Sequence, residues 1–92
     1  MTEAQEEAKK EYIETLDHNG EIEFKYNGFF YHIEPDYDKE DTYKIWKFTD
    51  QYEGGGDVIA ICSPAESVLE TKAFDGKTIL EIEDDMTDCI LR

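Results

Sequence analysis

The chain has 92 residues, of which 39% are hydrophobic and 13% aromatic, and its formal net charge is −15. This length supports one hydrophobic core and excludes two independently folded domains, so we expect a single domain over residues 1–92. The aromatic side chains can bury enough surface to make disorder over most of the chain unexpected. The negative charge disfavours direct binding to nucleic acids or anionic membranes and favours a basic protein partner.

The sequence predicts a cytoplasmic protein. Residues 1–20 lack the apolar core of a signal peptide, and no apolar run is long enough to span a membrane. In that compartment, Cys62 and Cys89 are expected to be reduced, buried thiols and not a disulfide.

The first expected element is a helix over residues 2–17. Thr2 and Gln5 form a capping-box pattern, and apolar residues recur every four positions, at Ala4, Ala8, Tyr12 and Leu16. Asn19 or Gly20 is expected to provide the left-handed residue that ends the helix.

The next segment predicts a β-hairpin over residues 21–34. Asn27-Gly28 separates two alternating runs, which is the strongest short-range hairpin signal. A two-residue turn fixes the register, so the core face is expected to carry the pairs Ile22–Ile33, Phe24–Tyr31 and Tyr26–Phe29. The other face, with the pairs Glu21–Glu34, Glu23–His32 and Lys25–Phe30, is expected to be mainly solvated.

Two further strands are expected at Thr42–Phe48 and Val58–Cys62. Ser63-Pro64-Ala65-Glu66 then predicts a helix start, with Ser63 as the N-cap and Pro64 as the first helical residue. The sequence leaves residues 77–86 open between helix and strand. The spacing of Ile79, Ile82 and Met86 favours a short helix, followed by a last strand near residues 88–91.

The expected order of elements is therefore α-β-β-β-β-α-α-β. It predicts an α+β domain with a mostly antiparallel sheet of four to five strands. The N-terminal helix and one or two short helices are expected to pack on one face of that sheet.

The sequence predicts no metal site, no cofactor and no enzyme activity. Residues 36–47 begin like a calcium loop, but the sixth position is not Gly and the twelfth is Lys47. Asp50, Glu53 and Asp57 offer weak calcium ligands, although a solvated loop is the favoured interpretation. The histidines and cysteines lack the paired spacing of zinc ligands.

The candidate nucleophiles have structural explanations. Ser63 is explained as a helix cap, Cys62 falls in an apolar strand, and His32 lies opposite Glu23. No lysine follows Gly54–Gly56 as a phosphate-binding loop requires, so these glycines predict an ordinary loop. Trp46 and Phe48 are more often core residues than an exposed anchor.

Acidic residues gather in three clusters, which are the candidate partner-binding sites. The loop clusters are Asp36, Asp38, Glu40 and Asp41, and Asp50, Glu53 and Asp57, with Tyr37 and Tyr52 as aromatic anchors. If residues 78–88 are helical, then one acidic stripe holds Glu81, Asp84, Asp85 and Asp88. Rows of carboxylates can imitate the phosphates of DNA, while a merely solvated surface is the alternative.

The run Phe74–Ile82, together with the helix start at residues 63–66, resembles segments of small uncharacterised proteins of bacteria and their phages. The size, charge and α+β order also resemble phage-encoded inhibitors of defence systems, including anti-CRISPR proteins that mimic DNA. That group has no shared motif, so the resemblance assigns no residue a role.

These patterns lead to one functional hypothesis and two alternatives. The hypothesis is a non-enzymatic inhibitor whose carboxylates occupy a basic, nucleic-acid-binding surface of a partner such as a phage-defence nuclease. The alternatives are an immunity or antitoxin-like protein that neutralises a toxin, and a housekeeping adaptor domain.

Overall fold

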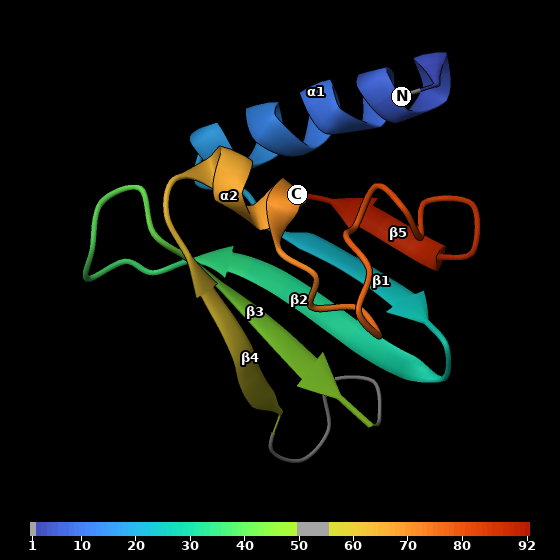
Figure 1. Ribbon diagram of the computed structural model, residues 1–92. Coiled ribbons are helices and arrows are strands. Elements are labelled where there is room, and N and C mark those ends of the chain that lie inside the picture. Colours follow the sequence, from blue (N-terminus) through green and yellow to red (C-terminus); the bar gives the residue numbers. More distant parts are fainter. Residues whose placement is uncertain (1, 50–55) are drawn as a thin grey trace.

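The computed structural model describes residues 2–49 and 56–92. Its elements, in chain order, are α1 (Glu3–Asp17), β1 (Ile22–Tyr26), β2 (Phe29–Pro35), β3 (Tyr43–Phe48), β4 (Asp57–Cys62), α2 (Ala65–Glu70) and β5 (Thr87–Leu91). The strands form one antiparallel sheet in the order β4-β3-β2-β1-β5, so the last strand returns to pair with the first (Figure 1). The expected α+β class is confirmed, with one short helix in the C-terminal half.

Helix α1 forms as its end signals predict. The Thr2 hydroxyl accepts a hydrogen bond from the Gln5 N–H at 3.1 Å, and Gln5 Oε1 accepts one from the Thr2 N–H at 3.0 Å. This reciprocal pair satisfies two donors that the first turn would leave unbonded. Asn19, with φ 58°, provides the left-handed residue after the helix. Ala8, Tyr12 and Leu16 are buried, whereas Ala4 is exposed.

The hairpin has the predicted register, with Ile22 opposite Ile33, Phe24 opposite Tyr31 and Tyr26 opposite Phe29. The expectation for its other face is partly wrong. Glu23 is buried and forms an ion pair with Arg92, at 3.0 Å between Oε2 and Nη2, because β5 brings the C-terminus beside β1. His32 contacts Glu21, although it lies directly opposite Glu23 in the register.

The core lies between one face of the sheet and a layer made by α1, α2 and residues 71–86. Phe74 is fully buried, and its ring packs edge-on against Phe24 and Tyr31, at centroid distances of 5.4 and 5.0 Å. Val68 and Leu69 face inward as predicted. An irregular segment thus supplies part of the core that a helix was expected to supply.

Two predictions for the C-terminal half are wrong. Ser63 does not cap α2: Pro64 occupies the N-cap position in an extended conformation, so the helix begins at Ala65. Residues 77–86 do not form an α-helix but a series of turns, in which the Ile82 carbonyl accepts from the N–H groups of Asp85 and Met86. The turns bury Ile79 and Ile82 without forming a regular helix. The three-residue spacing that suggested a helix therefore reflects the burial of both side chains in these turns.

The other face of the sheet is open, because the buried residues of both helices all belong to the core on the opposite side. Trp46 and Phe48 lie here and not in the core. Both are half-buried, with their rings stacked at a centroid distance of 6.1 Å. Both cysteines are free; Cys62 is buried as expected, but Cys89 is exposed on the edge strand. In the described part of the chain, no helix is long and apolar enough to cross a membrane.

Candidate functional site

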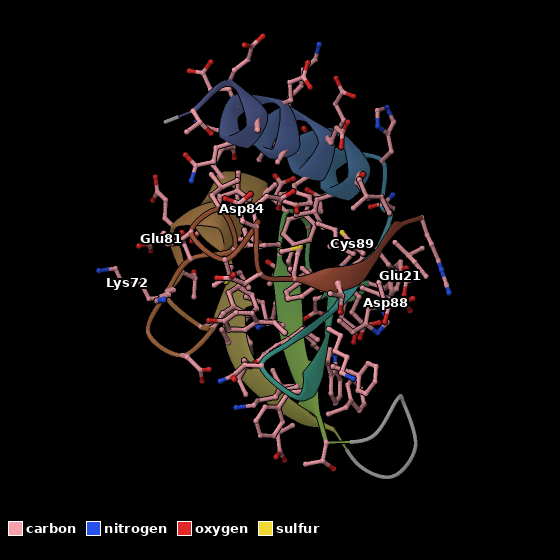
Figure 2. All side chains as sticks on the ribbon, turned by 90° about the vertical axis from the view of Figure 1, so that its right-hand side faces the viewer. Glu21, Lys72, Glu81, Asp84, Asp88 and Cys89 are labelled. Carbon is pink, nitrogen blue, oxygen red and sulfur yellow. The ribbon has the colours of Figure 1, made fainter. Side chains whose placement is uncertain are left out.

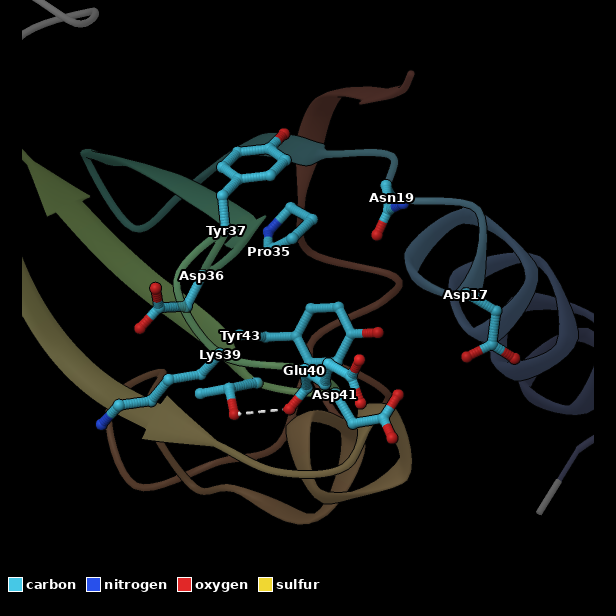
Figure 3. Close-up of a pocket in the computed structure, with 10 residues that line it drawn as sticks. Asp17, Asn19, Pro35, Asp36, Tyr37, Lys39, Glu40, Asp41 and Tyr43 are labelled. Carbon is cyan, nitrogen blue, oxygen red and sulfur yellow. Dashed lines mark hydrogen bonds between the residues drawn. The ribbon is translucent and has the colours of Figure 1, made fainter.

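The first acidic cluster lines a pocket of about 340 Å³ between the β2–β3 loop and the end of α1 (Figure 3). Glu40 and Asp41 point toward the side on which Asp17 of α1 lies, whereas Lys39 points away (Figure 3). Tyr37, one of the predicted aromatic anchors, is 73% exposed and lines this pocket. The pocket is therefore open, acidic and partly aromatic.

Local hydrogen bonds hold the loop in this shape. The Asp36 N–H donates to the Thr42 carbonyl at 2.8 Å, and Asp36 Oδ1 accepts from the Asp38 N–H at 3.0 Å. Asp36 is therefore used to build the turn, while Asp38, Glu40 and Asp41 are exposed. The predicted cluster thus divides into one structural carboxylate and three outward ones.

The pKa of Tyr43, a residue that lines the pocket, is affected by the negative charges around it. Tyr43 is buried there, and its hydroxyl donates to the Leu16 carbonyl at 3.2 Å. Burial is the main cause that raises the pKa of Tyr43, and the charges of Asp17, Asp41 and Glu66 raise it further. These three carboxylates come from α1, the loop and α2, so the negative charge converges on one place.

An acidic row on α1 continues from this pocket. Because Ala8, Tyr12 and Leu16 face the core, the opposite side of the helix is exposed, and it carries Glu3, Glu7, Glu11 and Glu14, with Lys10 as a basic residue among them. The row extends over a helix about 22 Å long. Sequence reasoning missed these residues as a site, although the exposed side of an amphipathic helix was the available signal.

The C-terminal acidic cluster lies against the start of the same helix. Gln5 Nε2 donates to the Leu80 carbonyl at 3.1 Å, and the Tyr12 hydroxyl donates to Glu83. These contacts attach residues 78–86 to α1 and leave Glu81, Asp84 and Asp85 exposed. The pKa of Glu81 is lowered, chiefly by a hydrogen bond from the Thr78 backbone N–H.

The predicted stripe does not form as one row. Glu81 and Asp84 lie together near α1, while Asp88 lies beyond Cys89, on the side of Glu21 (Figure 2). The reason is that β5 has already begun at Thr87 and carries Asp88 into the sheet. Only part of the C-terminal cluster therefore joins the surface of α1.

Most of the second predicted loop cluster falls outside the described residues. Asp50, Tyr52 and Glu53 lie outside the described residues, as do Gly54 and Gly55 of the glycine run. Asp57 is exposed at the start of β4, opposite Lys47. It lies at the far end of the sheet from α1 (Figure 1).

We call the combined surface the acidic band. It runs from the pocket along α1 to the turns that follow Thr78, and consists of Asp17, Asp38, Glu40, Asp41, Glu3, Glu7, Glu11, Glu14, Glu81, Asp84 and Asp85. Over residues 2–49 and 56–92, the two ion pairs are Glu21–His32 and Glu23–Arg92, and neither involves the band. The charge of the band is therefore not neutralised by ion pairs among the described residues.

A different cluster lies on the open face of the sheet. Ligand atoms of Glu21, His32 and Glu34 all lie within 4.8 Å of one another, and all three residues are half-buried. Sequence reasoning missed this cluster because the two glutamates and the histidine have no ligand spacing along the chain. Only the pairing of β1 with β2 brings them together.

Comparison of the chain with protein-family models, curated proteins and solved structures gave no match.

Proposed function

We propose that this chain is a non-enzymatic binding protein whose acidic band occupies a basic surface of a protein partner, of the kind that a nuclease uses to hold nucleic acid. The observation that carries this proposal is the acidic band itself. Carboxylates from three separate segments adjoin one another on one side of the fold, exposed and without ion pairs among the described residues. Uncompensated charge of one sign attracts a surface of the opposite sign.

The arrangement supports competition with a polyanion. Carboxylates on one face of a helix recur about once per turn, which is about 5.4 Å, and form a row of fixed negative charge comparable to a phosphate backbone. Such a row would meet lysines and arginines that otherwise contact phosphates. Association would be fast at low salt and weaker at high salt, because salt screens exposed charges.

The pocket beside the band is suited to a lysine or arginine side chain of the partner. Asp17, Glu40 and Asp41 provide carboxylates around it, and Tyr37 provides an exposed ring that a cation can approach. A basic side chain seated there would act as the anchor of the interface, and the carboxylates on α1 would supply the longer-range attraction. We propose that the chain performs this role in the cytoplasm.

The proposal is tested by capture and competition. The immobilised protein is exposed to cell lysate at low and high salt, and each captured protein is then assayed for binding to a fluorescent DNA or RNA duplex. We expect the column to capture basic nucleic-acid-binding proteins at low salt and to release them at high salt. We also expect the free protein to displace the duplex from these captured proteins.

Matched variants assign the effect to the band. E7Q/E11Q/E14Q removes three charges from the α1 row and is expected to reduce displacement strongly. D57N/E70Q/D88N removes three exposed charges outside the band and is the control. Equal losses in both variants would show that total charge matters and not the band. Capture of a basic toxin that binds no nucleic acid would instead favour the antitoxin alternative.

A further inference from the structure

Two glutamates meet across the open face of the sheet. Extending the β1–β2 register by one pair places Glu21 opposite Glu34, since Ile22 pairs with Ile33. Like charges directly opposite on neighbouring strands destabilise a sheet. His32 is two residues from Glu34 along β2, and its Nε2 contacts a Glu21 carboxylate oxygen. The arrangement thus has two carboxylates with an imidazole nitrogen beside them.

The backbone around the cluster is firmly held. The Glu21 N–H donates to the Arg92 carbonyl at 3.0 Å, and the Arg92 N–H donates to the Glu21 carbonyl at 2.9 Å. These two hydrogen bonds attach the backbone of Glu21 to the residue that follows β5. His32 and Glu34 are two residues apart in β2 and project from the same face. Strand positions of this kind hold side chains more closely than a loop does.

An outer partner orients one of the carboxylates. Trp46 lies opposite His32 on β3, and its Nε1 donates to Glu34 Oε1 at 2.9 Å. Hydrogen bonds of this type fix the orientation of metal-binding carboxylates in proteins. Glu23 is not available to the cluster, because its carboxylate pairs with Arg92.

We propose that Glu21, His32 and Glu34 form a binding site for a divalent transition metal ion, with Zn²⁺ as the best-suited ion. One imidazole nitrogen and two carboxylate oxygens are a ligand set that zinc accepts, at distances of about 2.0–2.2 Å, with the fourth position left for water. The imidazole favours zinc, cobalt or nickel over calcium and magnesium, which prefer oxygen ligands. The ligand atoms already lie within 4.8 Å of one another, so small side-chain movements suffice to close the site.

This site is independent of the proposed function. The acidic band lies on the helical layer, while the metal site lies on the opposite face of the sheet. Loss of zinc binding would leave displacement of a duplex from a partner unchanged, so failure of one proposal does not imply failure of the other. The rival explanation of the cluster is a hydrogen bond between His32 and Glu21 that holds these side chains together without a metal.

The test is calorimetric titration of the EDTA-treated protein with ZnCl₂, in a C89S background that removes the exposed thiol. We expect one Zn²⁺ per chain. H32Q, E21Q and E34Q are each expected to weaken binding by more than about tenfold, the smallest loss usual for an outer partner. W46F, which removes the hydrogen bond to Glu34 and keeps an aromatic ring, is expected to weaken it by roughly tenfold.

Two controls separate the site from general attraction of cations to an acidic protein. H18Q removes the other histidine, and E66Q/E70Q removes two carboxylates on α2. Both are expected to bind Zn²⁺ within about twofold of the parent affinity, since neither changes a ligand. The proposal is overturned if the parent protein does not bind zinc stoichiometrically, if H32Q binds as tightly as the parent, or if E66Q/E70Q weakens binding as much as E21Q/E34Q.

A spectroscopic measurement keeps the test valid should a variant lose stability. Trp46 is the only tryptophan of the chain and contacts Glu34, so Co²⁺ in the site is expected to quench its fluorescence at one equivalent. The bound Co²⁺ is also expected to show visible absorption, which Zn²⁺ should abolish by displacement. Quenching that persists in folded H32Q would contradict the assignment.

Discussion

The helical side and the open sheet face carry charged residues of the same kind but use them differently. On the open face, three carboxylates have partners: Glu21 contacts His32, Glu23 pairs with Arg92, and Glu34 accepts from Trp46. On the helical side, the acidic band makes no ion pair within the described residues.

Burial explains the contrast. Glu23 is buried, and Glu21 and Glu34 are half-buried, so losing water without gaining a partner would destabilise the fold. The band is exposed and hydrated, and it needs no internal partner. The difference teaches that the location of the charges, and not their number, indicates which of them are available to another molecule.

The largest expected effect comes from a change in the core that lies between the sheet and the helical layer. F74A empties a fully buried site beneath the helical layer and is expected to destabilise the protein by about 3–5 kcal/mol. F30A, on the half-buried open face, is expected to lose less than about 2 kcal/mol. Urea unfolding followed by far-UV circular dichroism measures both. Equal losses would show that the open face is packed as tightly as the core.

A smaller effect compares two buried hydroxyls of the core, one from the helical layer and one from the sheet. The Tyr12 hydroxyl donates to Glu83, so Y12F is expected to cost about 1–2 kcal/mol. The Tyr31 hydroxyl is buried without a hydrogen-bond partner among the described residues, so Y31F is expected to be neutral or slightly stabilising. The free energies of unfolding at pH 7 give the comparison. A large loss in Y31F would indicate a partner of that hydroxyl.

Alkaline pH sharpens the same comparison. Burial raises the pKa of Tyr31 from 10.0 to about 12, so the folded state holds this proton more tightly than the unfolded state does. The corresponding stability is fully present below pH 10 and is lost as the pH rises through about 12. Relative to Y31F, the wild type is expected to lose on the order of 1 kcal/mol by pH 11, measured by urea unfolding. Parallel pH profiles would contradict this.

The smallest expected effect concerns the acidic row. E7Q/E11Q/E14Q relieves like-charge repulsion at i, i+3 and i, i+4 positions and is expected to stabilise the protein by about 0.2–0.5 kcal/mol per pair. The gain should shrink as salt is added, because salt screens the same repulsion in the wild type. Thermal melts at low and high salt measure it. A clear destabilisation would mean that these carboxylates have structural partners.

Much of the N-terminal half could be predicted from the sequence, because its signals are local. The capping box of Thr2 and Gln5, the apolar spacing of α1 and the Asn27-Gly28 turn each act within a few residues. Since the side-chain period of a strand is two, the turn also determined which hairpin residues face the core.

Where local signals conflict, the tertiary structure decided. Residues 77–86 suit both a helix and a strand, and they adopt turns that bury Ile79 and Ile82 in the same core as Phe74. The half-buried position of Trp46 and Phe48 on the open face was decided in the same way. Their face of the sheet receives no helix, because both helices pack on the other side.

The sequence by itself determined the class of the fold, the net charge and the loop that forms the acidic pocket. Only the tertiary structure placed that loop beside the end of α1, and only strand pairing brought Glu21 to His32 and Glu34. The physical reason is that charge and turn preference belong to short segments of chain. A surface or a ligand cluster depends instead on which segments pack together, and long-range burial determines that packing.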